Sequence, residues 1–415
     1  MRVVEPHEFK NVKHPKKKRK SHRRLRIILV VVLVVYVATS LLRPLPSITT
    51  SVQALPASPV KEVAVSWPNY GQSAIGAVGY GILGTKGEPR ALPTASVAKV
   101  MTALAVLKQR PLAVGEQGLI ITIIQSDVDE YARTIAMDGS NVAVALGEEI
   151  TQYQALQALL LPSANNMAHT LARWAFGTEQ EYLRFVNNFA KSLGMANTNF
   201  VDASGFSEKT VSTAEDLVKL AVNAMDNPVI AEIASQKQAT IPVAGQIFNV
   251  NLLLGRNGIV GVKTGNTEQA GGCFMAAAVR EVGGKKVIAV SVIMGAPNLY
   301  TALQDSVPLV NSVLDGLTPT TLVLAGQTVG QTQASWGSSV KLAAKNTVSG
   351  VNWPTKSNKP SVNVANSIKT PIHDGQRLGV IEAQFGREIS KTDVIVVGQA
   401  RKPSLLWRLT PWFLH

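Results

Sequence analysis

Three short motifs combine residue types that could carry out acyl transfer on a serine. In chain order they are Ser96-x-x-Lys99, Ser163-Ala164-Asn165 and Lys263-Thr264-Gly265. A serine hydroxyl is a weak nucleophile at neutral pH, and it becomes reactive when a base lies within hydrogen-bonding distance. A lysine three residues further along a helix lies on the same face and can serve as that base once it has lost its proton.

The first motif is predicted to lie at the start of a helix. Apolar residues repeat at helical spacing over residues 95–107, behind a Pro93-Thr94 start signal. Ser96 therefore falls in the first turn, where the helix N-terminus favours developing negative charge. A Ser-x-x-Lys pair alone occurs often by chance, as an ordinary helix start with a solvated lysine, so the other two motifs decide the interpretation.

The second and third motifs fall on a bend and a strand. Ser163 and Asn165 follow the Leu-Leu-Leu-Pro sequence of residues 159–162. They are predicted to lie in a bend before a helical run over residues 167–176. The serine there can pass a proton, and the asparagine can bind an amide. Lys263 precedes an apolar run over residues 273–279 that is typical of a buried strand ending in a glycine turn. We therefore expect Lys263 on a strand that faces the nucleophile.

These residues resemble the serine penicillin-recognising enzymes, which share Ser-x-x-Lys and Lys-Thr-Gly signatures. Within that superfamily the chain most resembles the D-alanyl-D-alanine carboxypeptidases, the low-molecular-mass penicillin-binding proteins. The resemblance covers about residues 67–402 and is carried by five segments, which are residues 93–102, 161–166, 212–217, 249–253 and 263–267. It implies an α+β catalytic domain of the β-lactamase/transpeptidase type, with an antiparallel sheet flanked by helices.

The resemblance also implies a mechanism. Ser96 attacks the carbonyl of the penultimate D-alanine of a peptidoglycan stem pentapeptide and forms an acyl-enzyme, which water then hydrolyses. Lys99 is the expected general base, and Ser163 relays the proton to the leaving nitrogen. The expected substrate contacts are Asn165 for the peptide amide, Lys263 and Thr264 for the terminal carboxylate, and the backbone N–H groups of Ser96 and Asn266 for the oxyanion hole. Gly265 is also expected among the substrate-binding residues. No metal or other cofactor is expected, and β-lactams are expected to be covalent inhibitors.

Other functions of the same site stay open. A D,D-endopeptidase would use the site on peptidoglycan crosslinks, and a membrane-anchored wall-binding protein would not use it at all, although every motif residue is retained. A class A β-lactamase needs a glutamate-activated water, and no Glu-x-x-Leu-Asn segment lies between Asn165 and Lys263. Two departures from the family pattern, Asn166 and Asn266, leave the fine specificity open.

The formal charge of +14 is concentrated at the beginning of the 415-residue chain. Residues 1–26 carry eleven lysines and arginines against two glutamates, and an apolar stretch follows over residues 27–42. This pattern is typical of a membrane segment with its N-terminus in the cytoplasm, which makes nucleic-acid binding the weaker interpretation. No small-residue cleavage site follows directly, so an uncleaved anchor is favoured over a signal peptide. We expect a single-pass protein of the cell membrane with its catalytic domain outside the cytoplasm.

Six segments are predicted from these patterns. They are a basic cytoplasmic tail (1–26), a transmembrane signal anchor (27–42), a Ser-, Thr-, Pro- and Ala-rich linker (43–66), the catalytic domain (67–315), a small all-β sandwich (316–402) and an amphipathic aromatic tail (403–415). The tail is expected either to lie in the membrane interface or to pack on the β-sandwich.

Three remaining features are interpreted as structural. Cys273 lies in an apolar run and is expected to be a packed strand residue. His169 lies one helical turn beyond Asn165, where a packing role is favoured over catalysis. The acidic residues around Asp127 are expected to form a helix cap or a solvated loop.

Overall fold

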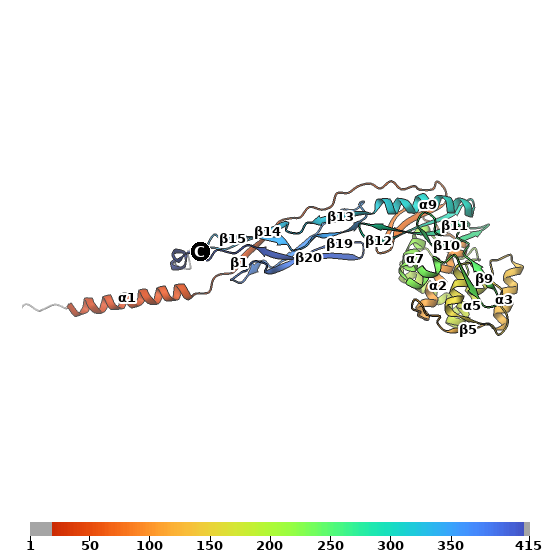
Figure 1. Cartoon of the computed structure of the whole chain (residues 1–415), viewed down its shortest axis with the longest axis horizontal. Helices are drawn as coiled ribbons and strands as arrows, with labels where there is room; N and C mark the ends of the chain where they lie inside the picture. Colours follow the sequence, from red (N-terminus) through yellow and green to blue (C-terminus); the bar gives the residue numbers. More distant parts are fainter. Residues whose placement is uncertain (1–18, 411–415) are drawn as a thin grey trace, which may run out of the picture.

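A computed structural model of the chain describes residues 19–410, in which a long helix, a β-domain and a globular domain follow one another along an elongated molecule (Figure 1). Residues 1–18 of the expected basic tail and residues 411–415 of the expected aromatic tail lie outside the described residues.

The first helix, α1 (Arg19–Leu42), projects from one end of the molecule. Its 21-residue stretch His22–Leu42 is the only helical segment within residues 19–410 that is long and apolar enough to cross a membrane, and its most apolar part is not buried inside the structure. A helix of this length rises about 30 Å, which matches the hydrocarbon thickness of a bilayer.

The globular domain is built on a five-stranded antiparallel sheet in the order β10-β11-β12-β2-β3. The strands are β2 (Gln72–Ala77), β3 (Gly81–Lys86), β10 (Ile259–Thr267), β11 (Gly271–Val282) and β12 (Lys285–Ala296). The predicted buried strand over residues 273–279 is confirmed as part of β11. Alternate residues of β11 enter different cores, since Cys273 and Met275 pack on one face of the sheet and Phe274 and Ala276 on the other.

Helices cover both faces of this sheet. They are the 3₁₀ turn η1 (Ala95–Ala98), α2 (Lys99–Gln109), α3 (Gln125–Ala136), α4 (Gln152–Leu160), α5 (Asn165–Phe176), α6 (Glu179–Ser192), α7 (Ala214–Asp226), α8 (Pro228–Ala234) and α9 (Leu299–Gly316). The last helix, α9, packs alone against β11 and β12 on one face. The others form the helical lobe on the opposite face, with α7 against β12 and β2. Three two-stranded ribbons complete the domain, namely β4 (Leu92–Pro93) with β7 (Val211–Ser212), β5 (Ile120–Thr122) with β6 (Glu149–Thr151), and β8 (Gln238–Ile241) with β9 (Gly245–Phe248).

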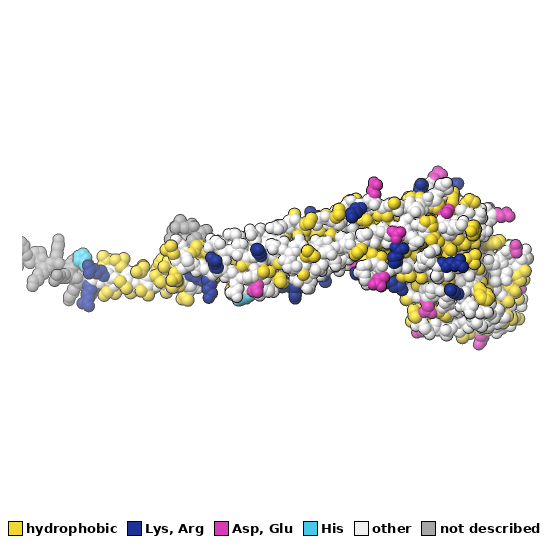
Figure 2. Space-filling model, turned by 45° about the horizontal axis from the view of Figure 1, so that its top comes forward, with side chains coloured by type: hydrophobic (Ala, Val, Ile, Leu, Met, Phe, Trp, Pro, Cys, Tyr) yellow, Lys and Arg dark blue, Asp and Glu magenta, His cyan; other side chains and the backbone are white. Residues whose placement is uncertain are grey.

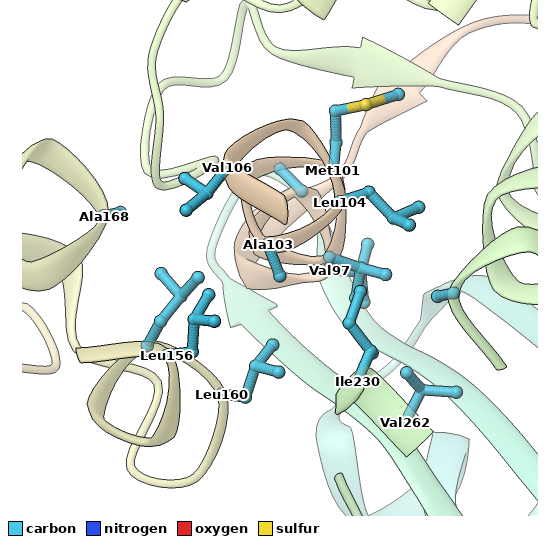
Figure 3. Packing of buried hydrophobic residues seen from close by; sticks show 14 of the residues in the cluster. Val97, Met101, Ala103, Leu104, Val106, Leu156, Leu160, Ala168, Ile230 and Val262 are labelled. Atoms are coloured by element: carbon cyan, nitrogen blue, oxygen red, sulfur yellow. The ribbon is translucent and has the colours of Figure 1, made fainter. Parts of the chain in front are cut away.

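Helix α2 lies at the centre of the helical lobe, and its residues 99–107 are all buried. Figure 3 shows its surroundings, with Leu156 and Leu160 of α4, Ala168 of α5, Ile230 of α8 and Val262 of β10. A helix that is buried all round must be largely apolar. The one charged residue on its buried stretch, Lys99, is therefore the exception that needs a chemical reason.

The β-domain consists of a seven-stranded sheet in the order β17-β19-β20-β15-β14-β1-β18 and a ribbon of β13 and β16. Its strands are β1 (Ile48–Val52), β13 (Thr318–Val323), β14 (Thr328–Gln333), β15 (Ser339–Ala344), β16 (Val348–Asn352), β17 (Ser361–Val364), β18 (Ser367–Ile368), β19 (Arg377–Phe385) and β20 (Glu388–Val397). Strand β16 packs over β19 and β20, so that Val348, Ile381 and Val394 share one apolar core. The α+β architecture followed by an all-β domain is the fold class predicted from the sequence.

Residues 43–66, which were expected to form only a linker, contribute a strand to the β-domain. Strand β1 pairs with β14 and β18 inside the large sheet, and Ile48 is buried in its core. The following residues run along the β-domain toward the globular domain (Figure 1). They are held on the β-domain by backbone hydrogen bonds, in which Ser58 N donates to Asn358 O at 2.8 Å and Lys61 N to Pro354 O at 2.9 Å. This segment is held by partners about 300 residues away in sequence, which local composition does not reveal.

The chain returns to its starting end after β20. Helix α10 (Leu405–Leu409) lies beside the C-terminal end of α1, where Tyr36 Oη donates to Leu409 O at 2.6 Å. The Trp407 ring also meets Trp336 of the β-domain edge to face, with centroids 5.6 Å apart. The described part of the tail therefore contacts both α1 and the β-domain.

Candidate active site

The first two predicted motifs meet at the amine of Lys99. Its Nζ lies 2.7 Å from Ser96 Oγ, 2.6 Å from Asn165 Oδ1 and 3.0 Å from the carbonyl oxygen of Ser204. Ser96 lies on η1, Lys99 begins α2 and Asn165 begins α5. The amine of Lys99 thus lies within hydrogen-bonding distance of both a hydroxyl and an amide oxygen.

Two residues beside the site adopt the left-handed backbone conformation that non-glycine residues rarely use. Ala95, which precedes Ser96, has φ +47°, and Ser163 has φ +68°. Neighbouring backbone contacts hold both positions, since Thr94 N donates to Thr210 O at 3.1 Å and Asn165 N to Ser140 O at 2.7 Å. Such conformations persist where the surrounding structure over-determines them, as is common at functional sites.

The environment of Lys99 favours its neutral form. The side chain is completely buried, and this burial lowers the pKa of Lys99 well below its ordinary value. The charge of Lys263 lowers the pKa further, while Asp202 opposes the shift. A neutral amine at hydrogen-bonding distance from a serine hydroxyl can accept its proton.

Lys263 lies on β10, as the sequence predicted for a strand residue of the third motif. Its side chain is 1% exposed and donates to Thr264 O at 3.1 Å. Burial lowers the pKa of Lys263 to about 7. Within the site, this lysine is the group with which a negatively charged ligand can pair.

Gly265 allows β10 to approach the nucleophile closely. A Cβ atom at this position would lie 3.1 Å from Ser96 N and 3.1 Å from Ala95 Cβ. Both distances are tighter than ordinary van der Waals contact, so any larger residue would push the strand away from η1. The third motif is therefore joined to the first through backbone packing.

The remaining predicted residues lie around this centre. Ser163 is buried in the loop that precedes Asn165, and its hydroxyl forms no hydrogen bond to any described residue. Asn266 follows Gly265 and is exposed. The structure thus joins Ser96, Lys99 and Asn165 by direct contact, whereas Ser163 and Asn266 make no direct side-chain hydrogen bond to them.

One loop at the site was missed by the sequence analysis. Ser204 O accepts a hydrogen bond from Lys99, and Asp202 holds the loop by accepting from Ser204 Oγ at 2.7 Å and Phe206 N at 2.9 Å. Gly205 has φ +74°, and a Cβ there would lie 2.1 Å from Ala95 O. The Asp-x-Ser-Gly sequence predicts a turn, but no spacing connects it to Lys99.

The other candidate residues have structural contacts. Asp127 is 3% exposed, caps α3 by accepting from Ile124 N at 3.0 Å, and binds the Arg173 guanidinium at 2.9 and 2.6 Å. His169 lies between Glu130 and Glu179 at 3.5 and 3.2 Å. Cys273 is a buried free thiol whose pKa is raised by burial to about 11. Among residues 19–410, no group of three or more His, Cys, Asp or Glu side chains could hold a metal ion.

Sequence comparison identifies a family whose members share this region. The sequence profile of a family described as D-alanyl-D-alanine carboxypeptidase matches residues 77–298, which is more than half of the chain and includes all three motifs.

Two proteins and one solved structure illustrate the similarity. A D-alanyl-D-alanine endopeptidase of Escherichia coli (strain K12) is 34% identical over 222 residues, covering 52% of this chain and 67% of that protein. The D-alanyl-D-alanine carboxypeptidase DacF of Bacillus subtilis (strain 168) is 25% identical over 320 residues, covering 74% and 79%. The crystal structure of the D-alanyl-D-alanine carboxypeptidase DacD from Francisella tularensis superposes with a TM-score of 0.56, covering 83% of this chain and 96% of that one. Its identity of 18% supports the fold alone.

Proposed function

The chain belongs to the D-alanyl-D-alanine carboxypeptidase family, serine peptidases of the penicillin-binding protein class, and we propose that Ser96 is the nucleophile of this activity. The observation that supports the assignment is the fully buried amine of Lys99, 2.7 Å from Ser96 Oγ and 2.6 Å from Asn165 Oδ1. The substrate is the D-Ala-D-Ala end of a peptidoglycan stem pentapeptide.

Acylation begins when neutral Lys99 accepts the hydroxyl proton of Ser96. The Oγ atom then attacks the carbonyl carbon of the penultimate D-alanine, and the backbone N–H groups of Ser96 and Asn266 stabilise the negative oxygen of the tetrahedral intermediate. When the intermediate collapses, the peptide C–N bond breaks, and the proton held by Lys99 passes through the hydroxyl of Ser163 to the leaving nitrogen, which leaves Lys99 neutral again. The terminal D-alanine departs and leaves an ester on Ser96.

Deacylation repeats the sequence with water as the nucleophile. Lys99 accepts a proton from water, the hydroxide oxygen attacks the ester carbonyl, and the C–Oγ bond breaks. The proton returns to Ser96 Oγ, which restores the free enzyme. A β-lactam enters the same route, because its strained amide carbonyl takes the place of the substrate carbonyl, and we propose that it remains attached to Ser96.

We assign substrate orientation to side-chain atoms of the site that can still form a hydrogen bond with a ligand. Asn165 Oδ1 is engaged by Lys99, whereas Nδ2 has no hydrogen-bond partner among the described residues. Nδ2 can therefore donate to a substrate carbonyl. Charged Lys263 and the hydroxyl of Thr264 bind the terminal carboxylate, which distinguishes a free peptide C-terminus from an internal peptide bond.

We further propose that α1 anchors the protein in the cytoplasmic membrane, with the basic residues before it in the cytoplasm. The β-domain and the globular domain then lie outside the cytoplasm, where peptidoglycan is found. In this arrangement the long axis of the molecule extends away from α1 toward the active site (Figure 1).

A second candidate function is D,D-endopeptidase activity on peptide crosslinks. The observation that favours it is the 34% identity to the Escherichia coli endopeptidase. The same nucleophile and base serve both reactions, so the products must separate them.

The test is incubation of the full chain with a muramyl pentapeptide or with a purified crosslinked muropeptide dimer, beside a Ser96→Ala variant. We expect Ser96-dependent release of one D-alanine from the pentapeptide, with the corresponding loss of mass. Cleavage of the dimer without D-alanine release would support the endopeptidase instead. D-alanine release by Ser96→Ala at the wild-type rate would overturn the assignment of the nucleophile.

A further inference from the structure

The end of the β-domain beside α1 contains a cavity that the peptidase reaction does not use. It has a volume of about 200 Å³. Its apolar wall includes Ile48 and Trp336, and its lining also includes the basic side chains of His373, Arg401 and Lys402. Among residues 19–410, no acidic side chain lines it.

The chain fixes this cavity at the C-terminal end of α1. Leu45, three residues beyond the helix, is one of its lining residues, and Pro403 just before α10 is another. Arg408 holds α10 in place, because its guanidinium donates to Leu41 O at 2.7 Å and to Arg43 O at 3.1 Å. If α1 spans the bilayer as proposed above, the cavity lies at the level of the outer headgroups.

The cations around this end are not neutralised within the described part of the chain. Arg401 and Lys402 are exposed, and their side chains form no hydrogen bond or ion pair with any described residue. Arg43 has a buried Nη2 atom with no hydrogen-bond partner there. The nearby carboxylate of Asp374 accepts a hydrogen bond from Gly398 N at 2.7 Å. Figure 2 shows basic side chains where the apolar surface of α1 meets the β-domain.

We propose that this cavity binds the phosphodiester headgroup of an anionic phospholipid in the outer leaflet. Arginine and lysine are the side chains that bind phosphate oxygens most effectively, and each basic residue near an anionic membrane surface adds to the attraction. The apolar wall suits the glycerol and upper acyl carbons of the same lipid. The inference rests on the proposed membrane anchoring by α1 and adds a lipid class to it.

The neighbouring surface has the composition of a membrane interface. Leu405 and Leu406 of α10 are 70% and 79% exposed, although both are large apolar side chains. Helix α10 lies beside α1, and the two helices contribute Trp407 and Tyr36, aromatic types that are enriched at membrane interfaces. A bound headgroup would therefore attach the β-domain to the bilayer at a second point, next to α1.

The experiment is native mass spectrometry of the full chain in detergent, titrated with phosphatidylglycerol or with zwitterionic phosphatidylcholine. We expect at least about tenfold tighter binding of the first phosphatidylglycerol molecule, and a loss of about 10- to 30-fold in the double variant Arg401→Gln, Lys402→Gln. The matched control removes two exposed lysines of the β-domain that do not line the cavity, Lys356→Gln with Lys359→Gln, and should bind as the wild type does.

Soluble glycerol phosphate distinguishes a lipid from a free phosphate. We expect millimolar glycerol phosphate to leave lipid binding unchanged, and full displacement would show instead that the cavity is a site for soluble phosphates. Equal binding of the two lipids, or an unchanged affinity in the double variant, would also overturn the proposal.

Two measurements on the same preparation separate this inference from the proposed function. D-alanine release tests the peptidase, and flotation with phosphatidylcholine vesicles tests anchoring by α1. If the chain floats and releases D-alanine but shows no lipid preference, only the headgroup site is wrong. If the chain does not float, both the anchor and the headgroup site are wrong, whereas the peptidase assignment is unaffected.

Discussion

The globular domain and the β-domain bury very different side chains. The globular domain buries four charged residues, Lys99, Asp127, Asp216 and Lys263, whereas the described residues of the β-domain bury none. The buried polar residues of the β-domain are uncharged, with Thr332 and Thr392 as examples. An ionisable group is expensive to bury unless it is neutralised or hydrogen-bonded.

This difference indicates which domain carries out the chemistry. Asp127 is explained by its ion pair with Arg173 and by its capping of α3. Asp216 is explained by its ion pair with Lys219. Lys99 and Lys263 form no ion pair with any carboxylate of the described residues. Their burial therefore serves something other than folding. The β-domain follows ordinary strand alternation and holds the active site at a distance from α1.

The largest expected effect comes from replacing Lys99. Lys99→Met keeps the length of the side chain in a buried position and removes the amine, so Ser96 loses its base. We expect the rate of acylation by a fluorescent penicillin to fall by about 10³-fold. The thermal unfolding midpoint shows whether the variant is folded. A folded variant with an acylation rate within tenfold of the wild type would contradict the role of Lys99.

A smaller effect is expected at Gly265. The methyl group of Gly265→Ala meets Ser96 N and Ala95 Cβ at 3.1 Å, which moves β10 away from the nucleophile. We expect acylation to slow by about 10²-fold, because misplacement by a fraction of an ångström impairs orientation. The control is Gly84→Ala on β3 of the same sheet, where the added atom meets the Trp67 ring. Equal rates in the two variants would show that the contact with η1 has no special importance.

The sequence predicted the side chains that meet at Lys99 because their types and spacing are themselves the signal. It missed Ser204, since a backbone carbonyl contributes the same group whatever its side chain. It also misplaced the start of α7 by one residue. The sequence Ser212-Thr213-Ala214-Glu215 predicts a capping box with Ser212 as the N-cap. The structure instead caps the helix with Thr213, whose side chain accepts from Asp216 N, while Ser212 pairs with Leu92 in a ribbon.

The linker expectation failed for a related physical reason. Strand β1 is a short run of β-branched residues whose partners on β14 and β18 are about 300 residues away. The apolar and glycine-rich run over residues 74–83 predicts a single strand. In the structure this run belongs to the hairpin of β2 and β3, in which Tyr80 N donates to Ala77 O at 3.0 Å. Amino-acid composition and hydrophobic periodicity describe local segments of the chain. The pairing of strands that are far apart in sequence depends instead on how the core is assembled.

The pH dependence of the reaction reports on both buried lysines. The reaction needs neutral Lys99, so its rate falls as the pH drops through the lowered pKa of that group. Carboxylate binding needs charged Lys263, whose pKa is about 7 in the free enzyme. We therefore expect kcat/KM to decline above about pH 7, by up to about tenfold per pH unit, through a rise in KM.

The control for this prediction is Lys263→Arg. A guanidinium stays charged throughout this range, so the alkaline decline should move to higher pH or disappear. A wild-type kcat/KM that stays constant between pH 7 and pH 9 would contradict the assignment of Lys263 to carboxylate binding.

The smallest effect on catalysis is expected from the β-domain core. Val394 is completely buried there, and Val394→Ala leaves a cavity that should lower the free energy of unfolding by about 2 kcal/mol. The rate of acylation at 25 °C should stay within about twofold of the wild type, because no β-domain side chain contacts the three motifs. An acylation rate tenfold lower in the folded variant would show that the two domains are coupled.

Peptide mapping of the full chain after reaction with a penicillin shows directly whether Ser96 forms the acyl-enzyme. We expect one adduct per chain, on the peptide that contains Ser96, and no adduct in Ser96→Ala. An adduct on any other residue, or none on correctly folded protein, would contradict this assignment.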